Sequence, residues 1–419
     1  MEAAGGVRDD TGEAAGIGFS YAALGYGLLF PDQVRRLGRE ELARIAAGVT
    51  SVLDEVYRRR LELSGERTRQ LTDDLTAGRV HLFVLLDHAR SVVATMAFVK
   101  LESVFSGVGV SMYEAGRAVK RIGSPPRLAT ALIDAAFLWA ARHLDGDYVV
   151  AEARVACPET GRPYNGRILD RVLRHLNFIP AYAAYSHYVA QTEAEPFVWA
   201  CSAINSDIWR KDVQQQTIHL PEGEESRMFA AMLDESLSAR VVFGARAAGQ
   251  DGGPRGEIRE LVGPSPMDES LYVLTRRPLP SRRVVGQVPG LTRPDGARAS
   301  FGLGDKLLVE EDVVGRPESA QVLNALYREG FALAGWAPSY YCYGRLALVL
   351  TRPGVVPADG VWVAPPDLSA LAHLPVTHKF LTHVLARRPA QDVRMVRESH
   401  DVRVGSALAT ERLSGQPTA

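Results

Sequence analysis

The chain has 419 residues, 46% of them hydrophobic, and at roughly 150 residues per domain this length predicts two or three folded units. Its 48 basic and 49 acidic side chains nearly cancel, which argues against a general attraction to nucleic acid or to an anionic membrane and leaves open only a local basic patch. Three widely spaced cysteines without a CxxC pair support neither a zinc site nor a disulfide framework, and they suit a reducing cytosol. The first residues do not have the basic and then apolar pattern of a signal peptide. We therefore expect a cytoplasmic protein, and composition alone names no activity.

Composition also indicates where the folded units begin and end. Residues 1–18 are rich in Gly, Ala and acidic residues and are expected to be disordered, and residues 388–419 are expected to form a polar tail. Between these ends we predict a first lobe at 19–195 and a second α/β lobe at 196–387. The most apolar helix candidate, 128–141, contains an aspartate and is too short to cross a bilayer.

In the first lobe, helical and strand patterns alternate. Apolar residues recur at helical spacing in segments 40–60, 66–77, 127–143 and 165–176. Short runs rich in apolar and β-branched residues predict strands at 80–86, 91–101, 112–122, 148–155 and 178–190. A hairpin is thus followed by a strand–helix–strand crossover, and this order predicts an α/β fold with a mixed sheet.

The second lobe has weaker patterns. We predict strands at 214–220, 270–275, 307–314 and 345–351, and helices at 222–237, 318–328 and 368–386. Segment 196–211 has a mixed pattern, and segment 241–266 contains AGQDGGPRG, which is typical of a flexible linker or an exposed loop.

Two segments, Val149 to Phe178 and Leu307 to Phe331, resemble each other. Each contains a strand, a Gly-Arg-Pro run, a helix and a Phe, followed by a Tyr-rich strand pair, and the two glycines are 154 positions apart. Because strand–helix units are common, this echo is explained either by chance or by a duplicated fold whose second copy has degenerated.

The turn from Lys120 to Ala129, KRIGSPPRLA, joins a predicted strand to a predicted helix. A helix start offers unpaired N–H groups and a positive dipole end to an anion. The element order and this turn resemble the GNAT acyltransferase superfamily, whose signature R/Q-x-x-G-x-G/A holds the pyrophosphate of coenzyme A. Two prolines in the run each remove one N–H donor, so the alternative is a Pro-initiated helix without a ligand. The resemblance implies a donor site at Arg121, Gly123, Ser124, Arg127, Leu128 and Ala129, with Asn165 further along.

The same resemblance implies a general acid near the end of the first lobe. The family often has a Tyr five positions before a Phe that here is Phe178, but this chain has Leu173 at that position. Tyr182, Tyr185 and Tyr188 follow, and Tyr185 is our candidate to replace the missing acid. The alternative for each of these tyrosines is packing on the sheet.

In GNAT proteins the two strands that match 112–122 and 148–155 splay apart around the pantetheine arm. An amine attacks a thioester only when it is unprotonated, so a carboxylate or ordered water that accepts its proton is useful there. Glu114 is our first candidate for this base and Glu152 the second, although Glu152 and Arg154 also fit a salt-bridged pair on one strand face. The run YEAGR, 113–117, further resembles a strand of acyl-homoserine-lactone synthases, which take acyl groups from acyl carrier protein. The donor is therefore either acyl-CoA or acyl carrier protein.

Three other patterns carry less weight. His143 and its neighbours fit the HxxxD pattern of condensation-type acyltransferases, but they lie at a helix-to-strand turn where such residues are ordinary. The histidines of the last predicted helix, at 373, 378 and 383, fit a solvated amphipathic helix better than a metal site. The aromatic cluster 340–343 fits either an acceptor pocket or sheet packing.

Taken together, these features favour an N-acyltransferase with two lobes, the second of them degenerate. The resemblance covers about Tyr21 to Ala190, and two-lobed GNAT relatives include N-myristoyltransferase, mycothiol synthase and the Fem-type ligases. It implies acetyl-CoA or another acyl-CoA as co-substrate, a small-molecule amine as acceptor and no metal. Two alternatives stay open, a non-catalytic GNAT-fold binding protein with a decayed site and an aminoacyl-tRNA-dependent transferase, which the neutral charge disfavours. The oligomeric state is open.

Overall fold

The structure of the chain is a computed structural model. Asn165, both predicted tails and most of the AGQDGGPRG segment lie outside the residues that it describes. The described residues are 25–57, 64–101, 110–125, 127–155, 166–174, 178–186, 195–244, 256–261, 271–277, 284–288, 301, 305–352 and 367–387.

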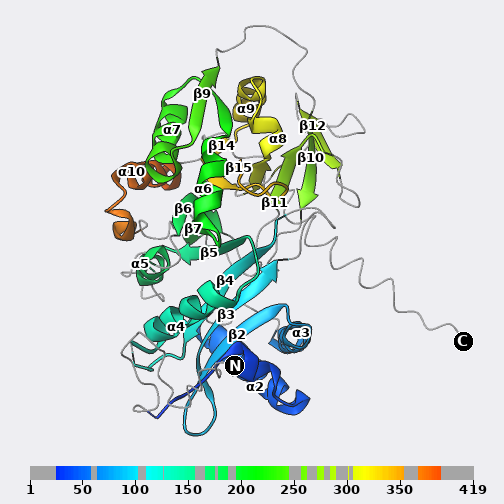
Figure 1. Ribbon diagram of the computed structural model, residues 1–419, viewed down its shortest axis with the longest axis vertical. Coiled ribbons are helices and arrows are strands. Elements are labelled where there is room, and N and C mark those ends of the chain that lie inside the picture. Colours follow the sequence, from blue (N-terminus) through cyan, green and yellow to red (C-terminus); the bar gives the residue numbers. More distant parts are fainter. Residues whose placement is uncertain are drawn as a thin grey trace, which may run out of the picture.

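One mixed sheet of thirteen strands runs through the described fold (Figure 1). From one edge to the other its strands are β1 (Gly27–Leu29), β2 (Val80–Leu86), β3 (Val92–Leu101), β4 (Met112–Lys120), β5 (Tyr148–Arg154), β7 (Glu195–Ala203), β6 (Ile179–Ser186), β14 (Ala332–Pro338), β15 (Leu346–Thr351), β13 (Lys306–Val309), β11 (Leu271–Thr275), β10 (Gly256–Leu261) and β12 (Val284–Val288). The pairs β4–β5 and β11–β13 are parallel, and the other neighbours are antiparallel. The predicted mixed α/β fold is therefore confirmed.

The strand order is mirrored about the pair β6–β14. Outward from this pair, the first half runs β6, β7, β5, β4 and the second half runs β14, β15, β13, β11. In both halves the first two steps are antiparallel and the third is parallel. The two halves therefore place the same kind of parallel strand pair at the same step from the middle of the sheet.

Helices cover both faces of the first half of the sheet. The hydrophobic cores show how β2 contributes to both faces, because Leu82 and Val84 pack with α2 and α3, whereas Phe83 and Leu85 pack with α4. This alternation explains why β2 is apolar and buried without a break from Leu82 to Leu86. The helices of this half are α1 (Pro31–Arg35), α2 (Arg39–Tyr57), α3 (Ser64–Thr76), α4 (Arg127–His143) and α5 (Gly166–Arg174).

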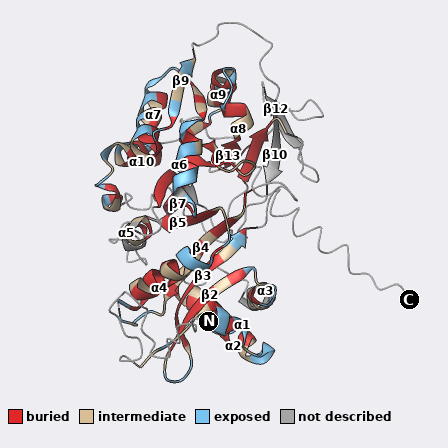
Figure 2. Cartoon of the chain, viewed as in Figure 1, coloured by how far each residue is buried: buried red, intermediate tan, exposed pale blue. Residues whose placement is uncertain are grey.

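The second half contains a separate parallel pair, β8 (Thr217–Pro221) and β9 (Arg240–Gly244). Its helical elements are α6 (Ser206–Gln214), α7 (Glu224–Leu237), α8 (Glu311–Val314), α9 (Ser319–Arg328), the 3-10 turn η3 (Ser369–Leu371) and α10 (Pro375–Ala386). The largest hydrophobic core combines strands of both halves, and Figure 2 shows buried residues continuing through the middle of the sheet.

Several predicted elements of the second half differ from the structure. The predicted strand 307–314 ends at Val309, because three consecutive acidic residues start the short helix α8, with the Glu310 carboxylate accepting the N–H of Glu311. The predicted helix 368–386 is divided, because Pro375 has no N–H donor and begins a new helix. Helix α6 was not predicted, and Asn205 caps its start by accepting the N–H of Ile208.

Candidate active site

The parallel strands β4 and β5 separate after three residue pairs. Their register runs from Met112 opposite Tyr148 to Glu114 opposite Val150, and beyond that β4 continues beside β3 while β5 continues beside β7. A cavity of about 60 Å³ lies at this split. Its lining residues are Met96, Ala115, Gly116, Arg117, Ala118, Ile133, Ala151, Glu152, Ala153 and Val172. Beyond the split, the backbone groups of β4 and β5 are no longer paired with each other.

A bulge in β4 shapes one wall of this cavity. Val119 lies opposite Thr95 and Gly116 opposite Ala97, so two residues of β4 face one residue of β3. Arg117 lies in this bulge with φ +55°, a conformation that is uncommon for a residue with a side chain. We did not predict the bulge, and the only sequence signal for it is the glycine inside a strand pattern.

The two predicted carboxylates come from the two strands that border the split. Glu114 occupies the last paired position of β4, and its side chain points away from the α4 face on which Tyr113 and Ala115 pack. Glu152 lies on β5 and lines the cavity itself. The backbone of Tyr185 lies on β6, opposite Pro196, but its side chain is outside the described part of the structure, so its predicted role stays a prediction.

The turn before α4 places the predicted phosphate-binding residues together, and a carboxylate of α2 already contacts it. The Ile122 N–H donates to Glu55 Oε1 at 2.8 Å, and Arg121 Nε lies 3.8 Å from Glu55 Oε2. The Ser124 N–H donates to the carbonyl of Arg121, and the φ of +83° at Gly123 suits a glycine. Glu55 therefore lies where an incoming anion would contact this turn.

Helix α4 begins beside this turn. Arg127 is its first residue and is exposed, so its charge is accessible to a ligand. Leu128 is fully buried in the core, and its N–H donates to the carbonyl of Pro125 at 3.2 Å. Ala129 is partly buried in the same first turn, and Asn165 lies outside the described residues. First-turn amides generally lack carbonyl partners within their helix, but here the Leu128 N–H is already bonded to the carbonyl of Pro125.

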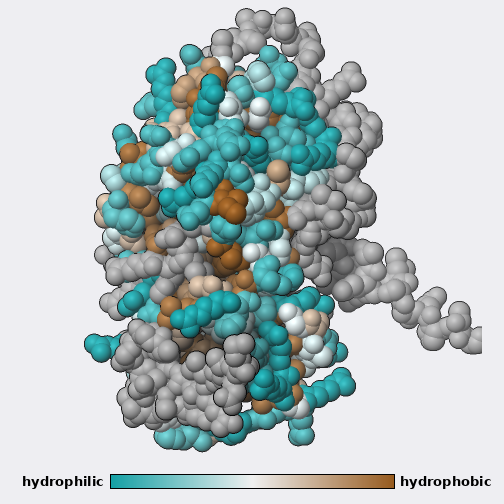
Figure 3. All heavy atoms as spheres, viewed as in Figure 1, coloured by the Kyte–Doolittle hydropathy of each residue, from teal (hydrophilic) through white to brown (hydrophobic). Residues whose placement is uncertain are grey.

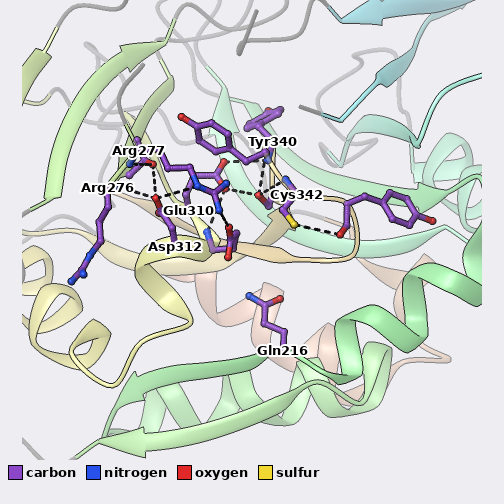
Figure 4. Close-up of polar contacts among 12 residues, drawn as sticks. Gln216, Arg276, Arg277, Glu310, Asp312, Tyr340 and Cys342 are labelled. Atoms are coloured by element: carbon purple, nitrogen blue, oxygen red, sulfur yellow. Dashed lines mark hydrogen bonds and ion pairs between the residues drawn. The ribbon is translucent and has the colours of Figure 1, made fainter. Parts of the chain in front are cut away.

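The corresponding strand pair of the second half does not separate. β11 and β13 stay paired along all four residues of β13. Beyond the last pair, Asp312 Oδ2 accepts from Thr275 Oγ1 at 2.9 Å and from the Arg276 N–H at 3.0 Å. Figure 4 shows the Asp312 carboxylate hydrogen-bonded to the backbone of Arg276. The second half therefore closes the position that is open in the first half.

Glu310 anchors the loop between β14 and β15 next to this closure (Figure 4). Its carboxylate is fully buried, and it accepts hydrogen bonds from Ser339 Oγ at 2.7 Å and from the Tyr340 N–H at 3.1 Å. Burial raises the pKa of Glu310 to about 7, against the opposite effect of these hydrogen bonds. Further along the loop, Tyr343 stacks on Tyr148 with ring centroids 5.4 Å apart. This arrangement matches the packing alternative for the aromatic cluster.

The structure also shows the surroundings of the HxxxD residues and bears on metal binding and membrane helices. Asp147, the aspartate of the HxxxD pattern, accepts a hydrogen bond from the Ser111 N–H at 2.7 Å, and Asp145 inside the pattern accepts one from Tyr113 Oη at 2.6 Å. Within the described ranges no three or more His, Cys, Asp or Glu side chains are grouped to hold a metal ion. In the same ranges, every helix is too short or too polar to cross a membrane.

Comparison with known proteins gives matches only among solved structures, since no family model and no curated protein matches the chain. A GNAT-family protein from Desulfovibrio desulfuricans is 13% identical, with a TM-score of 0.31, over 43% of this chain and 99% of its own. Spermidine N-acetyltransferase from Vibrio cholerae, in complex with CoA and spermine, is 9% identical, with a TM-score of 0.31, over 44% and 99%. Ribosomal-protein-S5-alanine acetyltransferase from Vibrio fischeri is 11% identical, with a TM-score of 0.29, over 43% and 94%.

These similar structures are named as acetyltransferases, one of them of the GNAT family. Each of them matches less than half of this chain. At identities this low a likeness concerns the fold alone, so no substrate and no residue role is transferred from them. The split between β4 and β5 brings Glu152 of β5 and the bulge of β4 to one cavity.

Proposed function

We propose that the chain is a GNAT-type N-acyltransferase that moves an acyl group from a thioester donor to the amine of a small molecule. The split between β4 and β5, with a cavity inside it and the start of α4 beyond it, carries this proposal. The thioester arm lies in the split, and the phosphate end of acyl-CoA or of acyl carrier protein lies at the turn from Arg121 to Arg127. The mirrored strand order supports a second GNAT-like lobe without an open split.

The reaction is a direct transfer that needs no covalent enzyme intermediate. The amine nitrogen attacks the thioester carbonyl carbon, the carbon–sulfur bond breaks, and the thiolate leaves and takes up a proton. Glu114, at the last paired position before the split, accepts the proton of the amine directly or through water. Glu152 lines the cavity on the opposite strand and is the second candidate for this role. Tyr185 is proposed as the acid that protonates the thiolate.

Filling the split tests the donor site. Ala118 lines the cavity and is partly exposed, so Ala118→Phe places a ring in the space of the thioester arm. We expect calorimetry to detect binding of acetyl-CoA, of longer acyl-CoAs or of acyl carrier protein to the unmodified chain, and at least tenfold weaker binding to the variant. Ala141→Phe, on the exposed side of α4, is the matched control. If no donor binds the unmodified chain, the non-catalytic alternative replaces this proposal.

The base is tested separately. Glu114→Gln removes the proton acceptor and keeps the shape of the side chain, so turnover should fall by about a hundredfold or more while donor affinity changes little. Steady-state rates across pH, together with calorimetry of the donor, measure both quantities. A variant with an unchanged pH profile would exclude Glu114 as the base.

A further inference from the structure

A second cavity lies at the far end of α4, next to His143. Its volume is about 350 Å³, and it is bordered by α1, by the first residues of β2 and β4, by the end of β3 and by the turn after α4. Small-molecule sites commonly occupy about 300–1,000 Å³, so a ligand of one or two rings fits. Since α4 has 17 residues and is therefore roughly 25 Å long, this cavity is separate from the turn at Arg127.

Aromatic rings form the floor of this cavity. The ring centroid of His81 lies 5.5 Å from that of Tyr113 and 5.2 Å from that of Trp139. Trp139 in turn stacks on His143 at 5.0 Å with an angle of 29° between the rings. Tyr113 is only 2% exposed, so the partly exposed Trp139 is the ring that a flat ligand can contact. The stacking of a base on an aromatic side chain is favourable for every base.

The charged side chains at the rim cancel. Arg35 and Asp32 are one helical turn apart on α1, and Lys100 at the end of β3 shares the rim with Asp145. Two cations and two carboxylates give no net charge. A polyanion such as a nucleotide triphosphate, or a polycation, would therefore meet as much repulsion as attraction here, which favours an uncharged polar ligand.

The hydrogen bonds at the rim fix which of its side chains donate and which accept. Arg35 Nη2 lies 2.6 Å from His81 Nδ1, and because a guanidinium only donates, Nδ1 is the acceptor and the imidazole proton sits on Nε2. Burial and the charge of Arg35 lower the pKa of His81 to about 4, so this neutral form persists near pH 7. On the other side of the cavity, the Asp145 carboxylate accepts a hydrogen bond from the Tyr113 hydroxyl, and its other lone pairs can accept further hydrogen bonds.

From this geometry we infer that the cavity binds a nucleobase, presented by a nucleoside without phosphate groups. A nucleobase is flat and uncharged, and its edge carries hydrogen-bond donors and acceptors side by side. Its ring lies against the partly exposed ring of Trp139, while Tyr113 is buried beneath His81 and Lys100. Its edge accepts from His81 Nε2 and donates to Asp145. This inference does not depend on the proposed acyl transfer, because the two cavities share no lining residue.

Calorimetry of the full chain with adenosine, guanosine, cytidine and uridine, each alone, tests the inference. We expect at least one nucleoside to bind with one site per chain, and to bind equally well when acetyl-CoA is present in excess. Trp139→Leu should weaken that binding at least tenfold, because it removes the ring on which the base stacks. Asp145→Asn should weaken it about tenfold by replacing a charged acceptor, and Asp145 is exposed, so this variant is expected to fold even if Trp139→Leu does not.

Phe243→Leu is the control, since it removes another partly exposed ring on β9. Circular dichroism checks that each variant is folded. The inference is overturned if no nucleoside binds, or if the control weakens binding as much as the two cavity variants do. An aromatic amino acid and spermidine serve as competing probes. The inference is also overturned if one of these probes binds, if Trp139→Leu abolishes its binding, and if the nucleosides do not bind.

Discussion

Glu55 is the residue that most directly affects the proposed donor site. Its carboxylate accepts the Ile122 N–H and lies near the Arg121 guanidinium, so it occupies the groups that a phosphate would use. The side chains of Arg121 and Glu55 are 36% and 35% exposed, and ion pairs with this much exposure contribute little to stability. The negative charge of Glu55 and a bound phosphate therefore compete for the same turn.

Neutralising Glu55 should strengthen donor binding. In Glu55→Gln the side chain keeps its length and loses the charge that repels a phosphate, so we expect acetyl-CoA affinity to rise about three- to tenfold, with a larger gain at low ionic strength. Calorimetry at two salt concentrations measures this change. Glu40→Gln, an exposed acidic residue in the first turn of α2, is the control. Weaker binding to Glu55→Gln would show that this carboxylate supports the turn instead.

Glu310 gives the protein a pH-dependent stability. Its pKa is raised from 4.5 to about 7 by burial, so the folded state holds a proton that the unfolded chain has released. The contribution of Glu310 to the free energy of unfolding is complete below about pH 4.5 and is lost as the pH rises to about 7. The shift in pKa corresponds to a change of about 3 kcal/mol in this free energy.

Glu310→Gln should remove this dependence, because an amide does not titrate. We expect the urea midpoint of the unmodified chain to fall between pH 5 and pH 8 by more than that of the variant, whatever the variant loses overall from its altered hydrogen bonds. Unfolding curves at the two pH values, followed by circular dichroism, measure both. Equal shifts in the two proteins would assign the pH dependence to other groups.

At the scale of elements, the pair β6–β14 joins the two halves of the sheet through a close approach. Gly335 lies opposite Tyr182, and a Cβ built on Gly335 would lie 2.1 Å from the carbonyl oxygen of Ala181. Its φ of +150° is also a conformation that side chains disfavour. Only a glycine lets the two strands approach in this way.

Gly335→Ala should therefore loosen the junction. Since the backbone must move to make room for a methyl group, we expect a loss of about 1–3 kcal/mol and a lower thermal midpoint. Gly27→Ala on β1 is the control, because a Cβ there meets nothing within 4 Å. Differential scanning calorimetry compares the two variants. A midpoint unchanged in Gly335→Ala would mean that β14 does not approach β6 as described.

The elements that could be predicted from the sequence are those in which the apolar residues of the pattern are the residues that the fold buries. Helix α4 and strand β2 carry long apolar patterns that neighbouring elements bury, so their positions were close to those predicted. The bulge at Arg117 was missed because it arises only in the pairing of β4 with β3. The helix α8 was missed because the acidic residues that start it lie inside the otherwise apolar run 307–314. The residues of the turn from Arg121 to Arg127 were identified, but the carboxylate of Glu55, 66 positions before Arg121, was not.

At the scale of the whole molecule, the two parallel strand pairs differ in one respect. The first pair opens after Glu114, and the second stays closed and is joined by Asp312 and its partners. If the thioester lies in an open split, the chain has one such place among its described residues.

We therefore expect one donor molecule per chain. Calorimetry with acetyl-CoA, analysed against the measured chain concentration, should give a stoichiometry near one. Asp312→Asn, which weakens the closure of β11 and β13, should not add a second site because the strands remain paired along β13. Two equivalent sites per chain would contradict the assignment of the donor to the first half alone.

The junction between β6 and β14 also has a consequence for synthesis of the chain. β6 ends at Ser186, while its partner β14 begins at Ala332, so about 145 residues leave the ribosome before that edge of β6 is paired. Until then β6 presents unpaired backbone groups, which favour pairing with other chains. Helix α6, which carries the exposed Ile208, is made in the same interval. Figure 3 shows apolar surface near the middle of this face of the molecule. The strand that pairs with this edge of β6 therefore comes from the part of the chain that is made later.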